Sequence, residues 1–199
     1  MKKSTWPNLI RKRPLWLIVL SVILGMLFNV YMEKLNTALK LPFFFDSIAT
    51  ATIATLFGPI PGVILGLLTN LFQEVINGFE GIYYPWGLCG ASTGLIVGLM
   101  ARSNKFSRPL HAFLATLFVT LSNSILGSII ATFMFGGITG VQIDYLVTGL
   151  IAAGQSILSS TFFARLPANV IDKGIAVAIA FVCYNKVYRQ ISAAEDELA

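Results

Sequence analysis

The polar residues best placed to bind a ligand follow a row of glycines on one apolar stretch. Gly58, Gly62 and Gly66 are followed by Asn70 and Glu74, each four residues after the last. On a helix this spacing puts all five residues on one side. Polar groups in hydrocarbon cost free energy unless they are paired, so an amide and a carboxylate here are candidates for a binding site. We therefore expect a ligand at the polar end of this row.

These candidates also have structural explanations. A carboxylate at Glu74, with Asn77 beside it near the helix end, can accept a hydrogen bond from a ligand amine or hydroxyl, or can face lipid headgroups. We favour the ligand site for Glu74. Asn70 and Asn123 lie deeper in apolar segments, where a hydrogen bond between helices explains an amide as well as ligand contact does.

An aromatic cluster follows the same helix. Tyr83, Tyr84 and Trp86 lie in a short loop between two glycine-rich segments, and the second segment repeats the four-residue spacing at residues 90, 94 and 98. Aromatic side chains are common anchors at a membrane surface. They also stack on flat aromatic ligands. Both explanations stay open, and the loop would direct these rings toward the pocket.

A second group of polar residues lies in the last third of the chain, at Gln155, Asn169 and Lys173. Asn169 and Lys173 are four residues apart and share a helix face, so together they could hold an anionic or carbonyl group. Asp172 is adjacent to Lys173 and need not pair with it, and the alternative for Lys173 is a surface anchor that reaches the headgroups. For Asp46 we favour a cap at a helix start over substrate contact.

The composition is that of an integral membrane protein. Of the 199 residues, 56% are hydrophobic and 12% are charged, and the mean hydropathy is +0.78. The apolar segments are long enough to cross a bilayer, which leaves no room for a separate soluble domain. The net charge of +5 comes from short basic clusters at segment ends, a pattern that reflects membrane orientation and not nucleic-acid binding. Cys89 and Cys183 are expected to be packing residues, and the single histidine and two scattered cysteines make no metal site.

The apolar segments predict a bundle of helices. We expect spans near 14–35, 43–57, 60–77, 86–101 and 109–135, and a last span from 174 toward 186. The segment 147–163 is either a seventh span or a re-entrant or lid-like helix at the outer face. The basic residues favour six spans, because seven would place Lys186 and Arg189 outside. Six spans place Arg165 externally, which counts against them.

The whole chain, 1–199, is predicted to be one membrane domain. It comprises a basic N-terminus (1–13), a helical bundle (14–189) and a polar tail (190–199). The basic N-terminal cluster is expected in the cytoplasm. The first apolar segment has no small-x-small cleavage site after it, so it is predicted to stay in the membrane as the first helix.

Three stretches resemble a known family. They are DSIATATIATLFGPIPGVILGLLTN at 46–70, the glycine-rich helix at 86–101, and LPANVIDKGIAVAIAF at 166–181. They resemble the S components of energy-coupling factor (ECF) transporters, the small membrane subunits that capture vitamins and related micronutrients. The resemblance runs from about residue 14 to 189 and is closest to S components of unassigned substrate, because the residue sets of the riboflavin, thiamine or biotin members are not seen.

The resemblance implies a bundle of six transmembrane helices in a bacterial or archaeal plasma membrane. It implies an outward-facing pocket near the external ends of the fourth to sixth helices. It also implies partners: a membrane scaffold subunit and two ATPase subunits. A small-xxx-small pair on the first helix contacts the scaffold in such proteins, and Ser21 and Gly25 hold that position here, where the family usually has alanines.

No arrangement in the sequence is typical of an enzyme. There is no nucleophile beside a base, and the phosphate-binding pattern GxxxxGK[ST] is absent. We therefore expect no catalysis and no cofactor, and energy for uptake must come from a partner or an ion gradient. The expected function is capture of a vitamin or related small heterocyclic micronutrient. The alternatives are a stand-alone secondary transporter, which often shows an internal repeat that is not seen here, and a ligand-sensing membrane protein.

Overall fold

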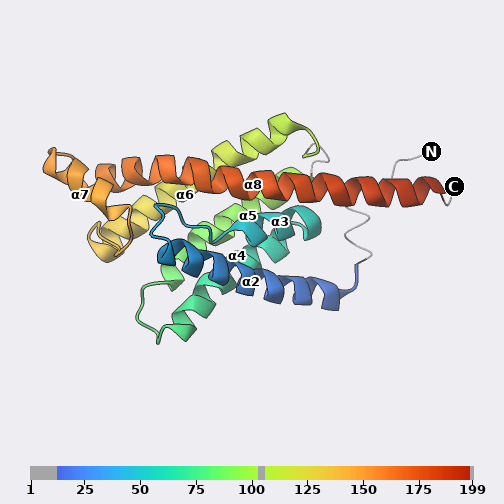
Figure 1. The fold of residues 1–199 in the computed structure, drawn as a ribbon, viewed down its shortest axis with the longest axis horizontal. Helices are drawn as coiled ribbons and strands as arrows, with labels where there is room; N and C mark the ends of the chain where they lie inside the picture. The colour runs from blue at the N-terminus through green and yellow to red at the C-terminus, as the bar shows by residue number, and fades with distance from the viewer. Residues whose placement is uncertain (1–12, 103–105, 198–199) are drawn as a thin grey trace.

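The computed structural model describes residues 13–102 and 106–197, and side chains as far as residue 187. Within these ranges the chain forms seven α-helices, one short 3₁₀ turn and no strand (Figure 1). The elements are α2 (Leu15–Ala38), α3 (Ile48–Phe57), α4 (Pro59–Ile76), η1 (Tyr84–Trp86), α5 (Gly87–Arg102), α6 (Pro109–Phe135), α7 (Asp144–Ala152) and α8 (Ile157–Glu197).

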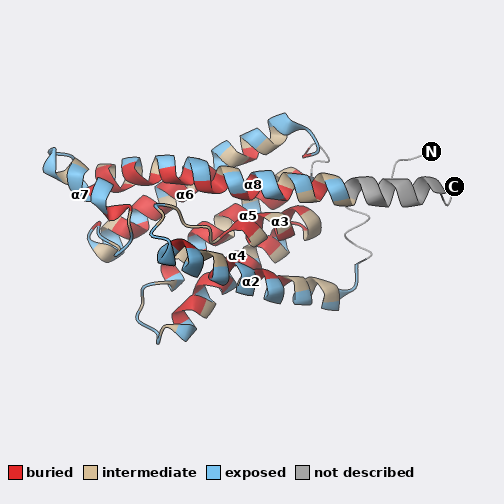
Figure 2. Ribbon diagram, in the orientation of Figure 1, coloured by how far each residue is buried: buried red, intermediate tan, exposed pale blue. Residues whose placement is uncertain are grey.

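Four of the described helices are long and apolar enough to cross a membrane: α2, α4, α6 and the part of α8 up to Val187. Their outward faces expose large apolar side chains, whereas the inward faces are buried (Figure 2). At a rise of about 1.5 Å per residue, the ten residues of α3 span only about 15 Å, half of the hydrocarbon core of a bilayer. The prediction of an all-helical membrane protein is confirmed.

The glycine rows on α4 and α5 bring the backbones of these two helices into direct contact. A Cβ atom built on Gly66 would overlap the backbone of Gly90, and one built on Gly94 would overlap that of Gly62. At Gly98 the added atom would overlap Pro59, at the start of α4. Small residues at four-residue spacing permit this approach because no side chain separates the helices. The predicted glycine contact is therefore confirmed.

The start of α3 differs from the prediction, which began a helix at residue 43. The helix begins at Ile48, and the preceding segment is not helical: Phe45 has a φ of +54°, a left-handed conformation that no helix continues through. The first turn of α3 is capped from another helix, since the backbone N–H of Ala49 donates to the side-chain Oδ1 of Asn29 on α2. The side-chain amide of Asn29 also donates to Thr50 and Thr69.

The last third of the chain also differs from the prediction. Segment 147–163 is divided between α7 and the beginning of α8, and the expected last span from 174 is part of one helix that starts at Ile157. Pro167 lies inside α8 and interrupts its sequence without ending it. Membrane helices tolerate such a proline because neighbouring groups satisfy the backbone. Residues 165–173 belong to this helix, and their polar members Arg165, Asn169, Asp172 and Lys173 are buried.

The contact between α4 and α5 gives a direct test. Replacing Gly66 with alanine places a methyl group against the backbone of Gly90, so the two helices must separate. Overpacking of this kind typically costs about 1–3 kcal/mol. We expect the Gly66→Ala variant to melt at a lower temperature than the wild type in thermal unfolding of the detergent-solubilised protein.

Gly174→Ala is the matched control. Gly174 also lies inside a helix, but the atom nearest to an added Cβ is Cγ2 of Thr116, at an ordinary 3.9 Å. This variant should keep the wild-type melting temperature. Equal melting of the Gly66→Ala variant and the wild type would contradict the close contact.

Candidate ligand-binding site

A cavity of about 300 Å³ lies among α2, α4, α5, α6 and α8. Three connecting segments complete its wall: residues 41–46, which precede α3, residues 82–86 between α4 and α5, and residues 139–143, which precede α7. This volume is at the lower end of the range of about 300–1,000 Å³ that is usual for small-molecule sites. Aromatic side chains, amides and ionic groups line the same space, so the cavity has both the size and the surface of a site for a small polar organic molecule.

One face of α8 supplies the polar side of the cavity. Arg165, Asn169 and Lys173 follow one another at four-residue spacing, and all three are buried and line the cavity. Asn169 is held by a hydrogen bond that its side-chain amide donates to Oγ of Ser124 on α6 (3.1 Å). The predicted shared face of Asn169 and Lys173 is confirmed as a geometric relation.

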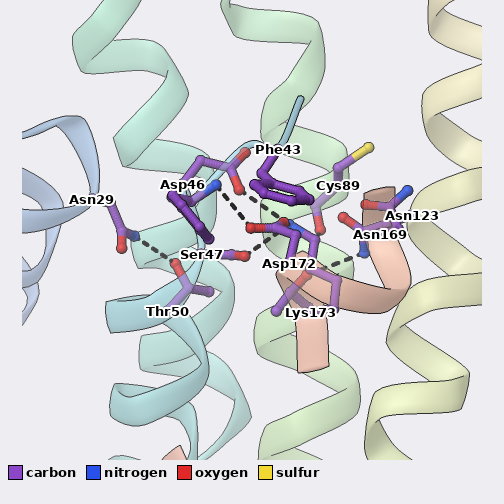
Figure 3. A network of polar contacts seen from close by, with 12 residues as sticks. Asn29, Phe43, Asp46, Ser47, Thr50, Cys89, Asn123, Asn169, Asp172 and Lys173 are labelled. Atoms are coloured by element: carbon purple, nitrogen blue, oxygen red, sulfur yellow. Dashed lines mark hydrogen bonds and ion pairs between the residues drawn. The ribbon is translucent and has the colours of Figure 1, made fainter. Parts of the chain in front are cut away.

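The ammonium group of Lys173 is surrounded by acceptors (Figure 3). Its Nζ lies 2.6 Å from Oδ2 of Asp172 and 3.1 Å from Oδ1 of Asp46, and donates to Oγ of Ser47 at 2.8 Å. Two of its three N–H donors form hydrogen bonds, to Asp46 and Ser47, and the carboxylate of Asp172 adds an ion pair. The charge of Lys173 is therefore already paired with carboxylates inside the protein.

The prediction that Asp46 caps a helix start is wrong, and the pairing of Asp172 with Lys173, which the sequence did not require, is present. Asp172 pairs with its neighbour Lys173 because the long lysine stem lets Nζ bend back to a carboxylate whose own Cβ points elsewhere. Asp46 does not cap α3: Ser47 holds the N-cap position without a side-chain cap hydrogen bond, and Asp46 is ion-paired across the cavity wall. Asp172 also accepts a hydrogen bond from the backbone N–H of Phe45 (2.8 Å), which ties the loop before α3 to α8 a second time.

Arg165 lines the cavity, and like Asn36 and Gln73 it was not selected by the sequence analysis. Its guanidinium lies 4.8 Å from the ring centre of Trp86 and 5.8 Å from that of Phe44, and Nη2 donates to Oγ1 of Thr139 (3.2 Å). The ring of Trp86 is also stacked on Phe135, with the planes 6° apart. The signal that could have found Arg165 is its spacing, four residues before Asn169 and eight before Lys173.

Five of the residues predicted to bind substrate line this cavity: Asn70, Trp86, Asn123, Asn169 and Lys173. For Asn123 both open explanations are compatible with its position. Its side-chain amide donates to the hydroxyls of Ser92 and Thr93 on α5, linking two helices, while the residue also faces the cavity.

The other four predicted residues, Glu74, Asn77, Tyr84 and Gln155, do not line the cavity. The carboxylate of Glu74 accepts hydrogen bonds from the backbone N–H groups of Gly81, Tyr83 and Tyr84, so it organises the loop after α4. The Asn77 side chain donates to a carbonyl of its own helix, Tyr84 is 53% exposed, and Gln155 accepts a hydrogen bond from Ser159 at the surface.

The predicted partner pair on α2 lies away from the cavity. Gly25 is buried, and a Cβ atom there would lie 2.9 Å from side-chain atoms of Ile53 and Leu65, so this position packs within the chain. Ser21, one turn earlier, is partly exposed.

Three residues of the cavity wall carry buried polar atoms without a hydrogen-bond partner in the described part of the chain. They are Oδ1 of Asn36, Nε2 of Gln73 and Nε of Arg165, which come from α2, α4 and α8. The Asn36 amide nitrogen donates to the carbonyl of Phe43, which fixes Oδ1 as the free acceptor. Unpaired buried polar atoms cost free energy, so three of them around one cavity indicate a binding site for a polar molecule that supplies the missing hydrogen bonds.

The phenol of Tyr83 adds a donor at the rim. Partial burial raises its pKa above the ordinary value, and the carboxylates of Glu33, Glu80 and Glu74 raise it further. The phenol therefore stays protonated at neutral pH.

Comparison with known proteins gives a family and a group of relatives. The model of a family described as ECF-type riboflavin transporter, S component, matches residues 17–190. The chain is also similar to UPF0397 proteins of Streptococcus pneumoniae, among them those of strains CGSP14, 70585 and ATCC BAA-255 / R6. Each is 24% identical over 161 residues, which cover 81% of this chain and 79% of the relative. No solved structure matches the chain significantly.

Removing the Lys173 charge tests the ionic cluster. In the Lys173→Met variant, Asp46 and Asp172 lose their shared counter-charge in a buried place. Breaking a buried ion pair from one side typically costs about 3–5 kcal/mol. We expect a large fall in the melting temperature of the detergent-solubilised protein, and partial recovery when Asp172→Asn is added.

Lys186→Met serves as the control, because Lys186 is an exposed lysine on the same helix. It should melt like the wild type. If the Lys173→Met variant also melted like the wild type, the cluster would not stabilise the fold.

Proposed function

Because the chain belongs to the family of ECF-type riboflavin transporter S components, we propose that it captures a small heterocyclic micronutrient in this cavity. It then delivers the molecule together with a membrane scaffold subunit and two ATPase subunits. The family is a transporter family, so the work of the chain is binding and reorientation, not catalysis. Bound ligand stabilises one conformation, and the ATPase module supplies the energy to change it.

The observation that carries this proposal is the set of unpaired polar atoms in the cavity wall. Asn36 offers an acceptor, and Gln73 and Arg165 offer donors, on three different helices. A heterocycle with ring nitrogens and exocyclic oxygens presents donors and acceptors around its edge and can satisfy such a set at once. The aromatic side chains of Phe43, Phe44 and Trp86 supply the apolar part of the wall.

For the membrane arrangement we infer six crossings, made by α2, by α3 together with residues 41–47 before it, and by α4, α5, α6 and α8, with α7 at the outer face and the N-terminus in the cytoplasm. An even number places the basic residues near Arg13, Arg102 and Lys186 on one side, in agreement with the bias of basic residues to the cytoplasm. Arg165 was the argument against this count. It is buried in the cavity wall, so it is not a loop charge that must lie outside.

Native mass spectrometry of the gently purified protein tests capture directly. We expect a small molecule to be retained by the wild type, and the scaffold and ATPase subunits to copurify when coexpressed. The Gln73→Leu variant removes one unpaired donor and should retain about tenfold less of the same molecule, the effect of one hydrogen bond to a ligand.

Gln155→Ala is the control, since Gln155 is polar and exposed and lies outside the cavity. It should retain the ligand like the wild type. Uptake by the purified chain alone in liposomes, collapsed by an ionophore, would instead show a secondary transporter and contradict the proposal.

A further inference from the structure

We propose that the molecule captured in this cavity carries a carboxylate that binds the guanidinium of Arg165. This inference rests on the proposed function and specifies the chemical class of its substrate. Two buried cations lie on the same face of α8 and line the same cavity, Arg165 and Lys173. Lys173 has carboxylates beside it, whereas Arg165 has none within 4 Å in the described residues, so we assign the carboxylate of the ligand to Arg165.

Lys173 already has its charge partners within the chain. Its Nζ donates to Asp46 and Ser47 and forms an ion pair with Asp172, so two carboxyl groups lie beside one ammonium. An incoming anion would have to displace a carboxylate from a buried ion pair, which is strongly unfavourable. The cluster holds two carboxyl groups beside one ammonium, so it offers an incoming anion no excess positive charge.

Arg165 has unused hydrogen-bond donors in the described part of the chain. The side chain is 2% exposed, yet in the part of the chain that the structure describes it has one hydrogen bond, from Nη2 to Thr139, and no carboxylate within 4 Å. Nε has no partner in the same described residues. A guanidinium has five N–H donors, and a buried charge that is not paired is costly. A ligand anion at this position would supply the missing partner.

The nearest acidic residue does not fill this position. Asp144 reaches Arg165 only through the hydroxyl of Thr139, which accepts from Arg165 and donates to Oδ1 of Asp144. The other oxygen of Asp144, Oδ2, accepts from the backbone N–H groups of Thr139, Gly140 and Val141. Asp144 therefore lowers the cost of burying the cation from a distance and leaves the guanidinium edge unoccupied.

Aromatic contacts hold the guanidinium in one orientation. Trp86 lies beneath it at 4.8 Å and is itself stacked on Phe135, while Phe44 approaches at 5.8 Å. A planar guanidinium fixed in this way presents a fork that matches the two oxygens of a carboxylate. Because the orientation is already set, little side-chain entropy is lost when the ligand binds.

The remaining charges favour a carboxylate over a phosphate. Glu33 and Asp46 also line the cavity, and Asp46 belongs to the cluster in which two carboxyl groups lie beside one ammonium. Arg165 and Lys173 are eight residues apart, about 12 Å along α8, so the cationic and acidic parts of the wall are separated. A single negative charge held at Arg165 avoids the acidic part, whereas a phosphate near two charges would meet more repulsion.

The test compares acids with their amides, which differ in charge and hardly in shape. The probes are pyridine-3-carboxylate against pyridine-3-carboxamide, and quinoline-3-carboxylate against its carboxamide, with binding measured by calorimetry on the detergent-solubilised full chain. For at least one pair we expect the acid to bind the wild type about tenfold to a hundredfold more tightly, the effect of a charge-assisted hydrogen bond. Arg165→Gln should abolish that preference, and Arg165→Lys should keep part of it.

Gln73→Leu is the matched control, because it removes another buried donor of the same cavity and should weaken acid and amide equally. If Arg165→Gln does not fold, the comparison of acid with amide on the wild type still decides. Equal binding of acid and amide in both pairs, or binding of neither acid, overturns the inference.

Two outcomes separate this inference from the proposed function. A neutral molecule retained in native mass spectrometry, or riboflavin bound with no effect of Arg165→Gln, overturns the carboxylate and leaves capture intact. A protein that retains no small molecule and binds neither riboflavin nor any probe overturns both.

Discussion

The structure depends on one buried ionic cluster, the ammonium of Lys173 held by Asp46, Asp172 and Ser47. It joins α8 to the segment before α3, residues that are 126 and 127 positions apart in the chain. Asp172 also binds the backbone of Phe45, so the loop of residues 41–46 is fixed against α8 at two successive residues. This loop forms one wall of the cavity, and the cavity therefore exists in its present shape only while the cluster is intact. The favourable charge pairing must offset the cost of removing charged groups from water, and the hydrogen bonds from Lys173 to Asp46 and Ser47 contribute to that offset.

The glycine contact between α4 and α5 and the polar face of α8 perform complementary tasks. Where Gly66 meets Gly90, backbones touch and no volume is left for a ligand. One turn beyond Gly66 the same side of α4 carries Asn70, which reaches the cavity. The change from glycine to amide along one helix face thus marks the point at which close packing gives way to a cavity. The row of polar residues on α8 faces the same cavity.

The helices could be predicted where apolar periodicity and proline boundaries agree, as at Pro109–Phe135, whose limits match the prediction. The glycine rows likewise predicted which helices touch, because spacing alone decides that. Glu74 could not be placed in the same way. Its hydrogen-bond donors are backbone N–H groups seven to ten residues later, and their position depends on a loop in which Gly78 and Gly81 adopt positive φ angles. The start of the last helix was also misplaced: the prediction began its span at residue 174, whereas α8 begins at Ile157 and the four-residue spacing turns Arg165, Asn169 and Lys173 toward the cavity.

The two cations of α8 show how one helix face can serve both the fold and a ligand. The ring of Phe44 lies 5.8 Å from the Lys173 ammonium and 5.8 Å from the Arg165 guanidinium. It therefore contacts both the ionic cluster at Lys173 and the cation that has unused donors. The position of Phe44 is set by its neighbours Phe45 and Asp46, which the cluster holds. The ionic cluster at Lys173 resists exchange of partners, because any replacement must first break a buried ion pair. It is therefore suited to hold the loop before α3 against α8. A cation with unused donors gains from a new partner, and it is suited to bind. The cluster at Lys173 thus maintains the aromatic surroundings that keep the Arg165 guanidinium in place.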